Sequence, residues 1–236
     1  MAIGDIRRDY ATGALGRDDL QADPLAQFQQ WFRQAGARRG AGGRFRRIAI
    51  AAYKLLQAIA GREPVDVNAM VLATADPTGQ PSARTVLRKG VDARGLIFFT
   101  NYDSRKGREL AANPHASLVF YWSELERQVC ISGTVSKLPP EESEAYFRSR
   151  PKGSRLAAWA SDQSSVVASR RVLEDKWQQM AARFPGDDVP LPPHWGGYVL
   201  APERMEFWQG RQNRLHDRFC YTRQPDGSWR LERLAP

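Results

Sequence analysis

Residues 69–100, AMVLATADPTGQPSARTVLRKGVDARGLIFFT, decide the fold, because strand-like runs alternate there with short turn signals. The runs cover Ala69 to Ala75, Ser82 to Lys89 and Leu96 to Thr100, and the turns lie at Asp76 to Gly79 and at Asp92 to Gly95. Asp, Pro and Gly are typical of tight turns between strands. Short strands joined by such turns indicate an antiparallel sheet or barrel and not a doubly wound parallel sheet.

The rest of the chain continues this pattern and adds a few helices. Further strands are expected at about 116–121, 127–136, 195–208, 217–223 and 228–233, and helices at 24–35, after Ser104, and at roughly 139–149 and 169–184. The predicted fold class is therefore mainly β with flanking helices (α+β). We expect an N-terminal arm at 1–23 and a single domain at 24–236, with a basic helical insertion at about 37–62.

The basic insertion carries most of the net charge of +9. It contains seven cations and no acid between Ala37 and Arg62, namely Arg38, Arg39, Arg44, Arg46, Arg47, Lys54 and Arg62. Its apolar residues follow a helical period, so we expect a solvated helix that packs on the body of the protein. Contact with a membrane surface or nucleic acid is the alternative, but neither is expected as a partner.

Composition and missing motifs narrow the function. No run of 18 apolar residues occurs, and MAIGDIRRDY lacks the apolar stretch of a signal peptide, so a cytoplasmic protein is expected. Cys130 and Cys220 lie in strand-like runs without CxxC spacing, which argues against a disulfide or a zinc site. GxGxxG, GxxxxGK[ST], GxSxG and HExxH are absent, and only three His are present. A bound organic cofactor, with no metal, is the expected source of the chemistry.

An anion site is predicted where a strand ends in TNYDSRKGREL, residues 100–110. Ser104 can cap a helix whose first residues are Arg105 and Lys106. Cations in the first turn oppose the helix dipole unless an anion binds there. The segment therefore predicts a phosphate site, the alternative being basic residues that simply face water.

A second anion site is predicted in YFRSRPKGS, residues 146–154. Tyr146 and Arg150 share a helix face at i, i+4, Pro151 ends that helix, and Ser154 then lies in the following loop. A phenol, a guanidinium and a hydroxyl that converge at a helix end suit a phosphate. An ordinary polar helix end is the alternative.

The segment WQGRQNRLHDR, residues 208–218, gathers a Trp, three Arg and a His into one turn. If Leu215 is extended and points into the core, Arg214 and His216 leave the same face of the strand and offer two donors to one ligand. A charged hairpin end is the alternative.

The motifs FFTNYDSRK, LERQV, YFxSRPxxS, SxQSS, PxxWGGY, EFWQGxxxRLHDR and RLAP, in this order, resemble the pyridoxine/pyridoxamine 5′-phosphate oxidase family over nearly the whole chain. The resemblance implies an FMN-binding split β-barrel and a homodimer with active sites at the subunit interface. It implies oxidation of pyridoxine or pyridoxamine 5′-phosphate to pyridoxal 5′-phosphate, with a hydride passing to the flavin and O₂ becoming hydrogen peroxide. A split-barrel protein that binds flavin or pyridoxal phosphate without turnover is the alternative.

The resemblance also implies the site residues. The FMN contacts would be Arg84, Thr85, Val86, Leu87, Arg88, Lys89, Phe99, Thr100, Arg105, Lys106, Gln128, Gln163, Ser164, Trp208 and Arg218. The substrate contacts would be Arg7, Tyr10, Lys89, Tyr146, Arg150, Ser154, Arg214, Leu215 and His216, with Arg214 and His216 as the catalytic pair. Phe99 stands where the family often has Tyr, and the family pattern gives the basic insertion no role, so we expect it to be dispensable for catalysis.

Overall fold

The computed structural model describes residue 10, residues 13–37 and residues 66–236. The expectations for Arg7 and for nearly all of the basic insertion lie outside these residues. Within them, no helix is both long and apolar enough to cross a membrane. Both cysteines are free, as expected.

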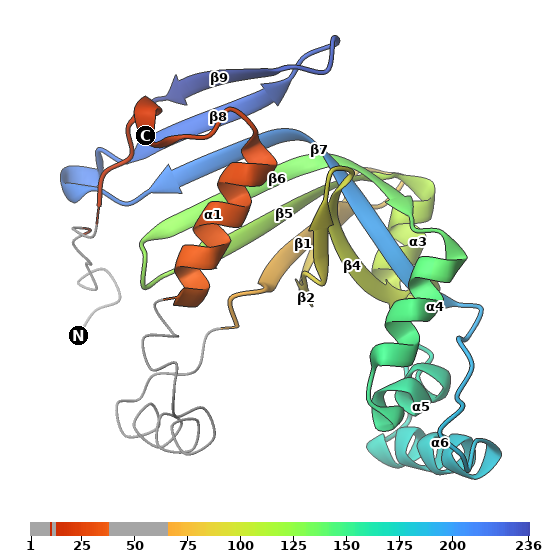
Figure 1. The fold of residues 1–236 in the computed structure, drawn as a ribbon. Coiled ribbons are helices and arrows are strands. Elements are labelled where there is room, and N and C mark those ends of the chain that lie inside the picture. Colours follow the sequence, from red (N-terminus) through yellow and green to blue (C-terminus); the bar gives the residue numbers. More distant parts are fainter. Residues whose placement is uncertain (1–9, 11–12, 38–65) are drawn as a thin grey trace, which may run out of the picture. The chain divides into compact units, whose positions relative to one another are not determined.

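The strands agree closely with those expected from the sequence, except that the short β3 was not expected (Figure 1). They are β1 (Ala69–Ala75), β2 (Pro81–Leu87), β3 (Gly90–Asp92), β4 (Gly95–Asn101), β5 (His115–Trp122), β6 (Arg127–Lys137), β7 (Trp195–Gln209), β8 (Asp217–Arg223) and β9 (Trp229–Leu234). Their hydrogen-bonded order is β2-β1-β5-β6-β7-β4-β3, and β8 pairs with β7 and β9. The β3–β4, β4–β7, β7–β8 and β8–β9 pairs are antiparallel. The mainly β class with flanking helices is confirmed.

The helices include one that the sequence analysis missed. They are α1 (Pro24–Ala37), α3 (Arg105–Ala112), α4 (Pro140–Ser149), α5 (Lys152–Ala160) and α6 (Arg170–Arg183), with short 3₁₀ turns at Arg17–Asp19 and Gln212–Arg214. Ser154 lies in α5, so the prediction that it lies in a loop was wrong. Pro151 ends α4, but its extended backbone also forms the N-cap of α5, which begins at the next residue.

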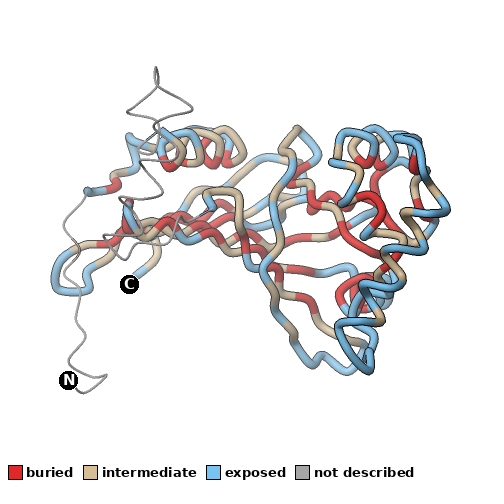
Figure 2. Tube along the Cα trace, turned by 90° about the horizontal axis from the view of Figure 1, so that it is seen from below, coloured by how far each residue is buried: buried red, intermediate tan, exposed pale blue. Residues whose placement is uncertain are grey.

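The chain divides into two compact units. The first comprises Met1–Val71, Leu118–Ile131 and Glu203–Pro236, and the second comprises Leu72–Ser117 and Ser132–Pro202. In Figure 2 the buried stretches follow the strands, while the outer faces of the helices and the loops are exposed.

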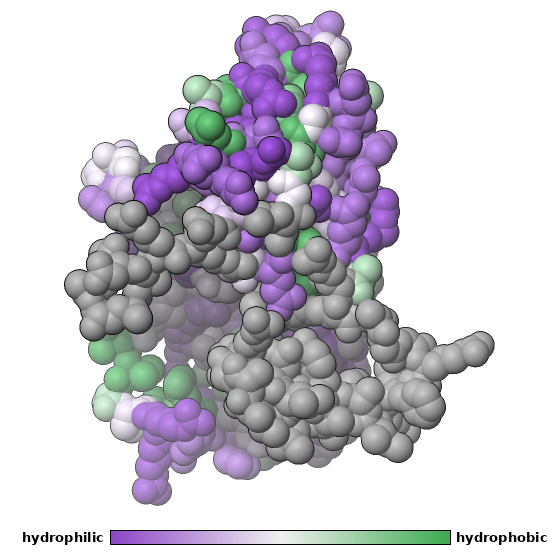
Figure 3. Space-filling view, turned by 90° about the vertical axis from the view of Figure 1, so that its left-hand side faces the viewer, coloured by the Kyte–Doolittle hydropathy of each residue, from purple (hydrophilic) through white to green (hydrophobic). Residues whose placement is uncertain are grey.

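Aromatic packing holds the first unit together. Phe28 of α1 lies 4.9 Å from the ring of Phe120, and Trp31 meets Phe207 edge-on at 5.2 Å. The segment before α1 also packs here, since Leu15 is buried and its N–H donates to Asp217. Charged and polar residues dominate the top of Figure 3, over the β8–β9 hairpin.

The second unit contains the helices α3 to α6 and the strands β2, β3 and β4. Phe147, Leu156, Val189 and Trp195 form a buried cluster against which Trp177 of α6 packs. This cluster fixes α4 and α5 beside the start of β7, and that placement positions the cavity described below.

Gly95 is required for the close pairing of β4 with β7. Its φ is +141°, and a Cβ at this position would lie 1.8 Å from the carbonyl oxygen of Leu200. We expect Gly95→Ala to lower the free energy of unfolding by about 2 kcal/mol or more, because both the strain and the overlap must be relieved. Urea titration followed by tryptophan fluorescence measures the change.

Gly36→Ala is the matched control, because Gly36 lies in α1 with nothing within 4 Å of the added methyl group. It should raise the free energy of unfolding by up to about 1 kcal/mol. Equal stability of Gly95→Ala and the wild type would contradict the account of this strand pair.

Candidate active site

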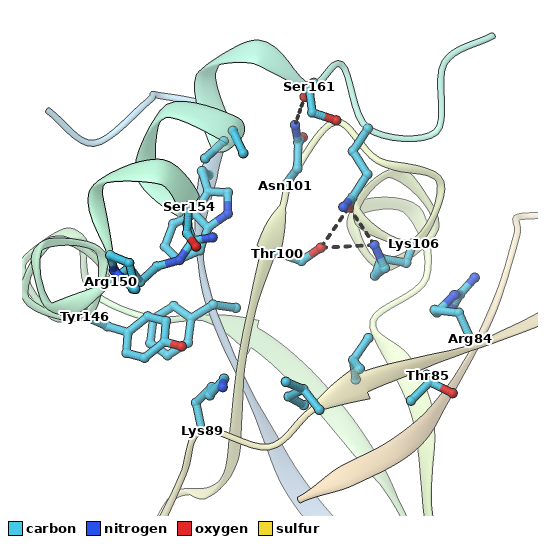
Figure 4. A pocket seen from close by; sticks show the side chains of 18 residues that line it. Arg84, Thr85, Lys89, Thr100, Asn101, Lys106, Tyr146, Arg150, Ser154 and Ser161 are labelled. Carbon is cyan, nitrogen blue, oxygen red and sulfur yellow. Dashed lines mark hydrogen bonds between the residues drawn. The ribbon is translucent and has the colours of Figure 1, made fainter. Parts of the chain in front are cut away.

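A cavity of about 660 Å³ lies within the second unit (Figure 4). It is lined by Arg84, Thr85, Val86, Leu87, Lys89, Phe99, Thr100, Asn101, Lys106, Tyr146, Arg150, Pro151, Ser154, Ala157, Ala158, Ser161, Gln163 and Trp195. Residues of both predicted phosphate sites therefore line one cavity. Asn101, Ser161 and Trp195 were not predicted, although they stand inside the motifs FFTNYDSRK, SxQSS and PxxWGGY, respectively.

The lining carries four cations, Arg84, Lys89, Lys106 and Arg150, and none of the lining residues is acidic. Concentrated positive charge in a concave site attracts anions and strengthens their binding. The cavity is therefore suited to a ligand with one or more phosphate or carboxylate groups.

Lys106 occupies one end of this cavity. Ser104 caps α3 by accepting a hydrogen bond from the N–H of Gly107, as predicted, and the next two residues begin the helix. The Lys106 ammonium is buried and donates to Thr100 Oγ1 at 3.0 Å and to Gln163 Oε1 at 2.8 Å. Burial, with a further contribution from the charge of Arg84, lowers the pKa of Lys106 to about 8. A ligand anion would restore the charge that burial disfavours.

Glu109 lies one turn further along α3 and is buried. Its carboxylate accepts from Ser82 Oγ at 2.6 Å, Arg84 Nη2 at 3.1 Å and Arg105 Nε at 2.8 Å, and also from Thr74 Oγ1. Burial opposes its ionisation, but these hydrogen bonds outweigh burial and lower the pKa of Glu109 to about 2. Arg105 is thereby turned to Glu109 and does not line the cavity, whereas Arg84 does.

Arg150 marks the other end of the cavity. Its guanidinium lies 4.7 Å above the ring of Trp195, and Trp195 is stacked in turn on Phe99. Burial lowers the pKa of Arg150. Its Nη1 is buried and has no hydrogen-bond partner among the described residues. Such a group costs free energy unless a ligand pairs with it.

Tyr146 and Lys89 lie next to Arg150. The ring of Tyr146 stacks on Phe99 at 3.9 Å, and in Figure 4 Tyr146, Arg150 and Ser154 lie together on one side of the cavity with Lys89 close by. The predicted i, i+4 relation of Tyr146 and Arg150 thus places both side chains on one side of the cavity, and Ser154 joins them from α5.

A second cluster of predicted residues belongs to the first unit. Trp208 and His216 have ring centroids 4.6 Å apart, and Tyr10 meets each of them edge-on, at 5.6 and 5.5 Å. Leu215 is 69% exposed, so the expectation that it points into the core was wrong. The segment is not an extended strand there, because Gln212–Arg214 forms a 3₁₀ turn.

The remaining predicted residues are not part of the cavity lining. Arg88, Arg105 and Ser164 lie in the second unit, and Gln128, Arg218, Trp208, Tyr10, Arg214, Leu215 and His216 lie in the first. Gln128 donates to Cys130 Sγ at 3.3 Å. Arg218 pairs with Glu206 at 2.8 Å and donates to the carbonyl oxygen of Ala235.

Residues 62–184 match the family described as pyridoxamine 5′-phosphate oxidase, and residues 195–236 match the pyridoxine 5′-phosphate oxidase C-terminal dimerisation region. The chain belongs to the pyridoxamine 5′-phosphate oxidase family. The pyridoxine/pyridoxamine 5′-phosphate oxidase 1 of Ralstonia nicotianae is 54% identical over 100% of this chain and 99% of its own. The pyridoxine/pyridoxamine 5′-phosphate oxidase of Paraburkholderia phymatum is 51% identical over 99% of each chain. These relatives confirm the enzyme class expected from the sequence.

Two solved structures resemble the fold. PhzG from Burkholderia lata, solved in complex with tetrahydrophenazine-1-carboxylic acid, superposes with a TM-score of 0.75 at 31% identity and covers 94% of this chain and 98% of its own. A pyridoxamine 5′-phosphate oxidase-related, FMN-binding protein from Nostoc punctiforme gives a TM-score of 0.60 at 20% identity, over 80% of this chain and 97% of its own. These neighbours confirm the expected split β-barrel.

We expect Glu109→Gln to lower the free energy of unfolding at pH 7 by about 1 to 3 kcal/mol, because Arg84 and Arg105 lose their charged acceptor. The folded-state pKa of Glu109, about 2, is below the ordinary value of 4.5. Its contribution is therefore complete above pH 4.5 and is lost as the pH falls towards 2. The stability difference between wild type and variant, measured by urea titration, should shrink over that window.

Glu144→Gln is the matched control, because Glu144 forms an exposed i, i+4 pair with Arg148. It should change the free energy of unfolding by less than about 0.5 kcal/mol. A Glu109→Gln protein as stable as this control would contradict the buried-acceptor role.

Proposed function

We propose that the protein is an FMN-dependent oxidase that converts pyridoxine 5′-phosphate and pyridoxamine 5′-phosphate to pyridoxal 5′-phosphate, with O₂ as the electron acceptor and hydrogen peroxide as the second product. With pyridoxamine 5′-phosphate, oxidation gives an imine, which water hydrolyses to the aldehyde and ammonia. The observation that carries this proposal is the cavity itself, which has cations at both ends and no acid in its lining. Two phosphorylated aromatic molecules, a cofactor and a substrate, need such a site.

The cavity residues fit FMN at the end formed by α3. Lys106, buried and without a carboxylate partner in the described residues, supplies charge for a phosphate. Arg84 lines the same end, and Thr100 and Gln163 add polar groups. We assign FMN to the cavity residues Arg84, Thr85, Val86, Leu87, Lys89, Phe99, Thr100, Lys106 and Gln163. We also assign to it Arg88, Arg105, Gln128, Ser164, Trp208 and Arg218, which do not line the cavity of this chain.

The opposite end fits the substrate phosphate. Arg150 Nη1 is a buried donor that requires an acceptor, and Lys89, Tyr146 and Ser154 surround the same position. Trp195 holds the guanidinium from one face, which reduces the ordering that a ligand must supply. A phosphate here would anchor the substrate by one end and leave its ring free to be oriented by other residues.

The match of residues 195–236 to a dimerisation region supports a homodimer. That region contains the cluster of Trp208, Arg214, Leu215 and His216, and Tyr10 packs against it. In the proposed dimer this cluster and Arg7 belong to the active site at the subunit interface, so an isolated monomer would have little activity.

When bound, FMN would supply the two-electron chemistry, taking up the hydride from the substrate C4′ carbon and passing electrons to O₂. The chain's own residues bind, orient and polarise. The phosphate-binding residues at the two ends of the cavity would hold the flavin ring and the substrate ring face to face. Positioning of this kind can lower a reaction barrier by roughly 7 to 11 kcal/mol in favourable cases. Arg214 and His216 are proposed to act on the substrate ring as the catalytic pair.

The neighbour PhzG supports a competing function. Its structure holds a tricyclic carboxylic acid, and it is 31% identical to this chain. With the α3 end assigned to FMN, one anion anchor remains at Arg150, and it suits a carboxylate as well as a phosphate. We prefer the phosphorylated substrate because the relatives that are about 50% identical are named pyridoxine/pyridoxamine 5′-phosphate oxidases.

An absorbance spectrum of the purified protein, followed by addition of pyridoxine 5′-phosphate in air, tests the proposal. We expect a flavin spectrum and the appearance of aldehyde and peroxide in equal amounts. Flavin without turnover would favour a binding protein, and turnover of tetrahydrophenazine-1-carboxylic acid alone would favour the competing function. No flavin after incubation with FMN would contradict both.

Arg150→Met tests the substrate end separately. It should raise KM for pyridoxine 5′-phosphate by roughly 10- to 100-fold, because a charge-assisted hydrogen bond is lost. Arg148→Met, two residues earlier, where the side chain is exposed on α4 and paired with Glu144, should leave KM unchanged. Equal KM values for both variants would contradict the assignment of Arg150 to the substrate phosphate.

The lowered pKa of Lys106 predicts how the affinity for FMN depends on pH. The free protein should hold Lys106 charged below about pH 8 and lose that charge above it. A phosphate stabilises the charged form, so the Kd for FMN should rise by roughly tenfold between pH 8 and pH 9.5. Flavin fluorescence quenching measures this, in a range where the phosphate, with a pKa near 6, stays fully ionised.

Two controls isolate the contribution of Lys106. Riboflavin lacks the phosphate and should bind the wild type with little change over this range. Lys106→Met should bind FMN weakly at every pH. An FMN Kd that stays flat from pH 8 to pH 9.5 in the wild type would contradict the role of this ammonium group.

A further inference from the structure

The imidazole of His216 makes one hydrogen bond that defines where its proton lies. The main-chain N–H of Arg211 donates to His216 Nδ1 at 3.1 Å. A ring nitrogen that accepts a hydrogen bond carries no proton, so a neutral imidazole in this position has its proton on Nε2. Nε2 then faces away from Arg211, because the two ring nitrogens lie on different sides of the ring.

We propose that His216 acts as a neutral hydrogen-bond donor through Nε2–H, in a tautomer fixed by the main-chain N–H of Arg211, and that it does not act as a general base. This inference rests on the proposed function, since it defines how His216 meets the substrate. The donor would bind an electron-rich acceptor atom of the substrate ring and hold it during oxidation. The proton that leaves the substrate would have to go to another group.

The loop between β7 and β8 is built to maintain this contact. The N–H of Gly210, next to Arg211, donates to the carbonyl oxygen of Glu126 at 2.8 Å. Between Arg211 and His216 the chain reverses through Asn213 and Arg214, which have φ values of +57° and +61°. Two consecutive non-glycine residues in the left-handed region are uncommon, and this conformation persists where the surrounding contacts hold it.

Asp217 fixes the other side of the loop. Its carboxylate accepts from the N–H of Leu15 at 3.1 Å, from Arg211 at 3.1 Å and from Arg233 at 2.7 Å. These donors occupy both carboxylate oxygens, and no hydrogen bond joins Asp217 to the imidazole among the described residues. His216 therefore lacks the arrangement in which a carboxylate takes the Nδ1 proton and makes the far nitrogen a base.

The charged form of His216 is disfavoured by the same surroundings. Protonation of Nδ1 would direct its hydrogen at the N–H of Arg211 and abolish the bond. The charged groups around the ring are three arginines, Arg211, Arg214 and Arg233, and one carboxylate, that of Asp217. The ring of Tyr10 packs edge-on against the imidazole. Burial first, and then the charge of Arg214, lower the pKa of His216.

Aromatic contacts orient the ring, so Nε2–H has a defined direction. Trp208 lies 4.6 Å from the imidazole with its plane inclined by 43°, and Tyr10 stands edge-on at 83°. Within the part of the chain that is described, no group accepts from Nε2. A donor that is fixed in direction and left for a ligand is preorganised to bind an acceptor.

Nitrogen NMR of the holoenzyme, with ¹⁵N-labelled histidine, tests the tautomer directly. The chain has three His, and His216 is assigned by its absence from His216→Gln. We expect a neutral imidazole with Nε2 protonated at pH 7, and a coupling across the hydrogen bond between the Arg211 amide and Nδ1. A proton on Nδ1, or a charged ring at pH 7, would overturn the proposal. This result does not depend on turnover, so it stands apart from failure of the proposed function.

Two substitutions separate a donor from a base. In His216→Gln the amide nitrogen can reach the place of Nε2 and donate, although it cannot accept a proton. In His216→Asn the side-chain oxygen can replace Nδ1 as the acceptor for Arg211, but nothing reaches the place of Nε2. We expect kcat/KM to fall in both, and to fall about tenfold further in His216→Asn, the effect of one lost hydrogen bond to the ligand.

If His216 is a base, both variants lack that base, and kcat/KM should fall equally in the two. That result would overturn the proposal. A larger loss in His216→Gln than in His216→Asn would overturn it as well. His115→Gln is the control, since His115 is exposed at the start of β5 and should leave kcat/KM unchanged. Near-ultraviolet circular dichroism of each variant verifies that the fold is retained.

Discussion

The buried carboxylate of Glu109 is the interaction on which the cavity depends. It accepts hydrogen bonds from side chains of β1, β2 and α3, and two of its four donors are arginines. Without it, Arg84, Arg105 and Lys106 would place three positive charges close together with no counter-charge among these partners. One carboxylate compensates only part of that positive charge. This end of the cavity therefore keeps a net positive charge that can pair with a ligand anion.

The two ends of the cavity obtain their positive charge by different physical means. Lys106 sits among neutral oxygens, and its pKa of about 8 makes its charge sensitive to what binds beside it. Arg150 remains charged under all ordinary conditions, and its guanidinium packs on the ring of Trp195. Its Nη1 has no hydrogen-bond partner among the described residues. A compact ammonium suits one phosphate contact as a point charge, while the planar fork suits directional hydrogen bonds to another.

The sequence predicted the strands well because strand length, alternation and turn residues are local properties. It also predicted both cation clusters, since a capped helix start and an i, i+4 pair are local too. It missed α5, because Pro151 was taken only as a helix end and not also as the cap of the next helix. It placed Leu215 in the core because a two-residue period was assumed, whereas the left-handed turn at Asn213 and Arg214 breaks that period. Trp195 and Glu109 act through contacts between distant segments, which spacing along the chain does not show.

Strain at Asn213 and Arg214 has a physical use if the Arg211 amide is to define the state of His216. An extended strand would carry residue 216 about 16 Å beyond residue 211, at roughly 3.3 Å per residue, and no main-chain group of Arg211 could reach the ring. The reversal returns the imidazole to that amide at 3.1 Å. The free energy stored in the turn is offset by the bonds of Gly210 and Asp217 on its two sides. The left-handed turn and the fixed tautomer of His216 thus depend on each other. If the turn became extended, His216 would lose its hydrogen bond to the Arg211 amide, and its tautomer would no longer be fixed.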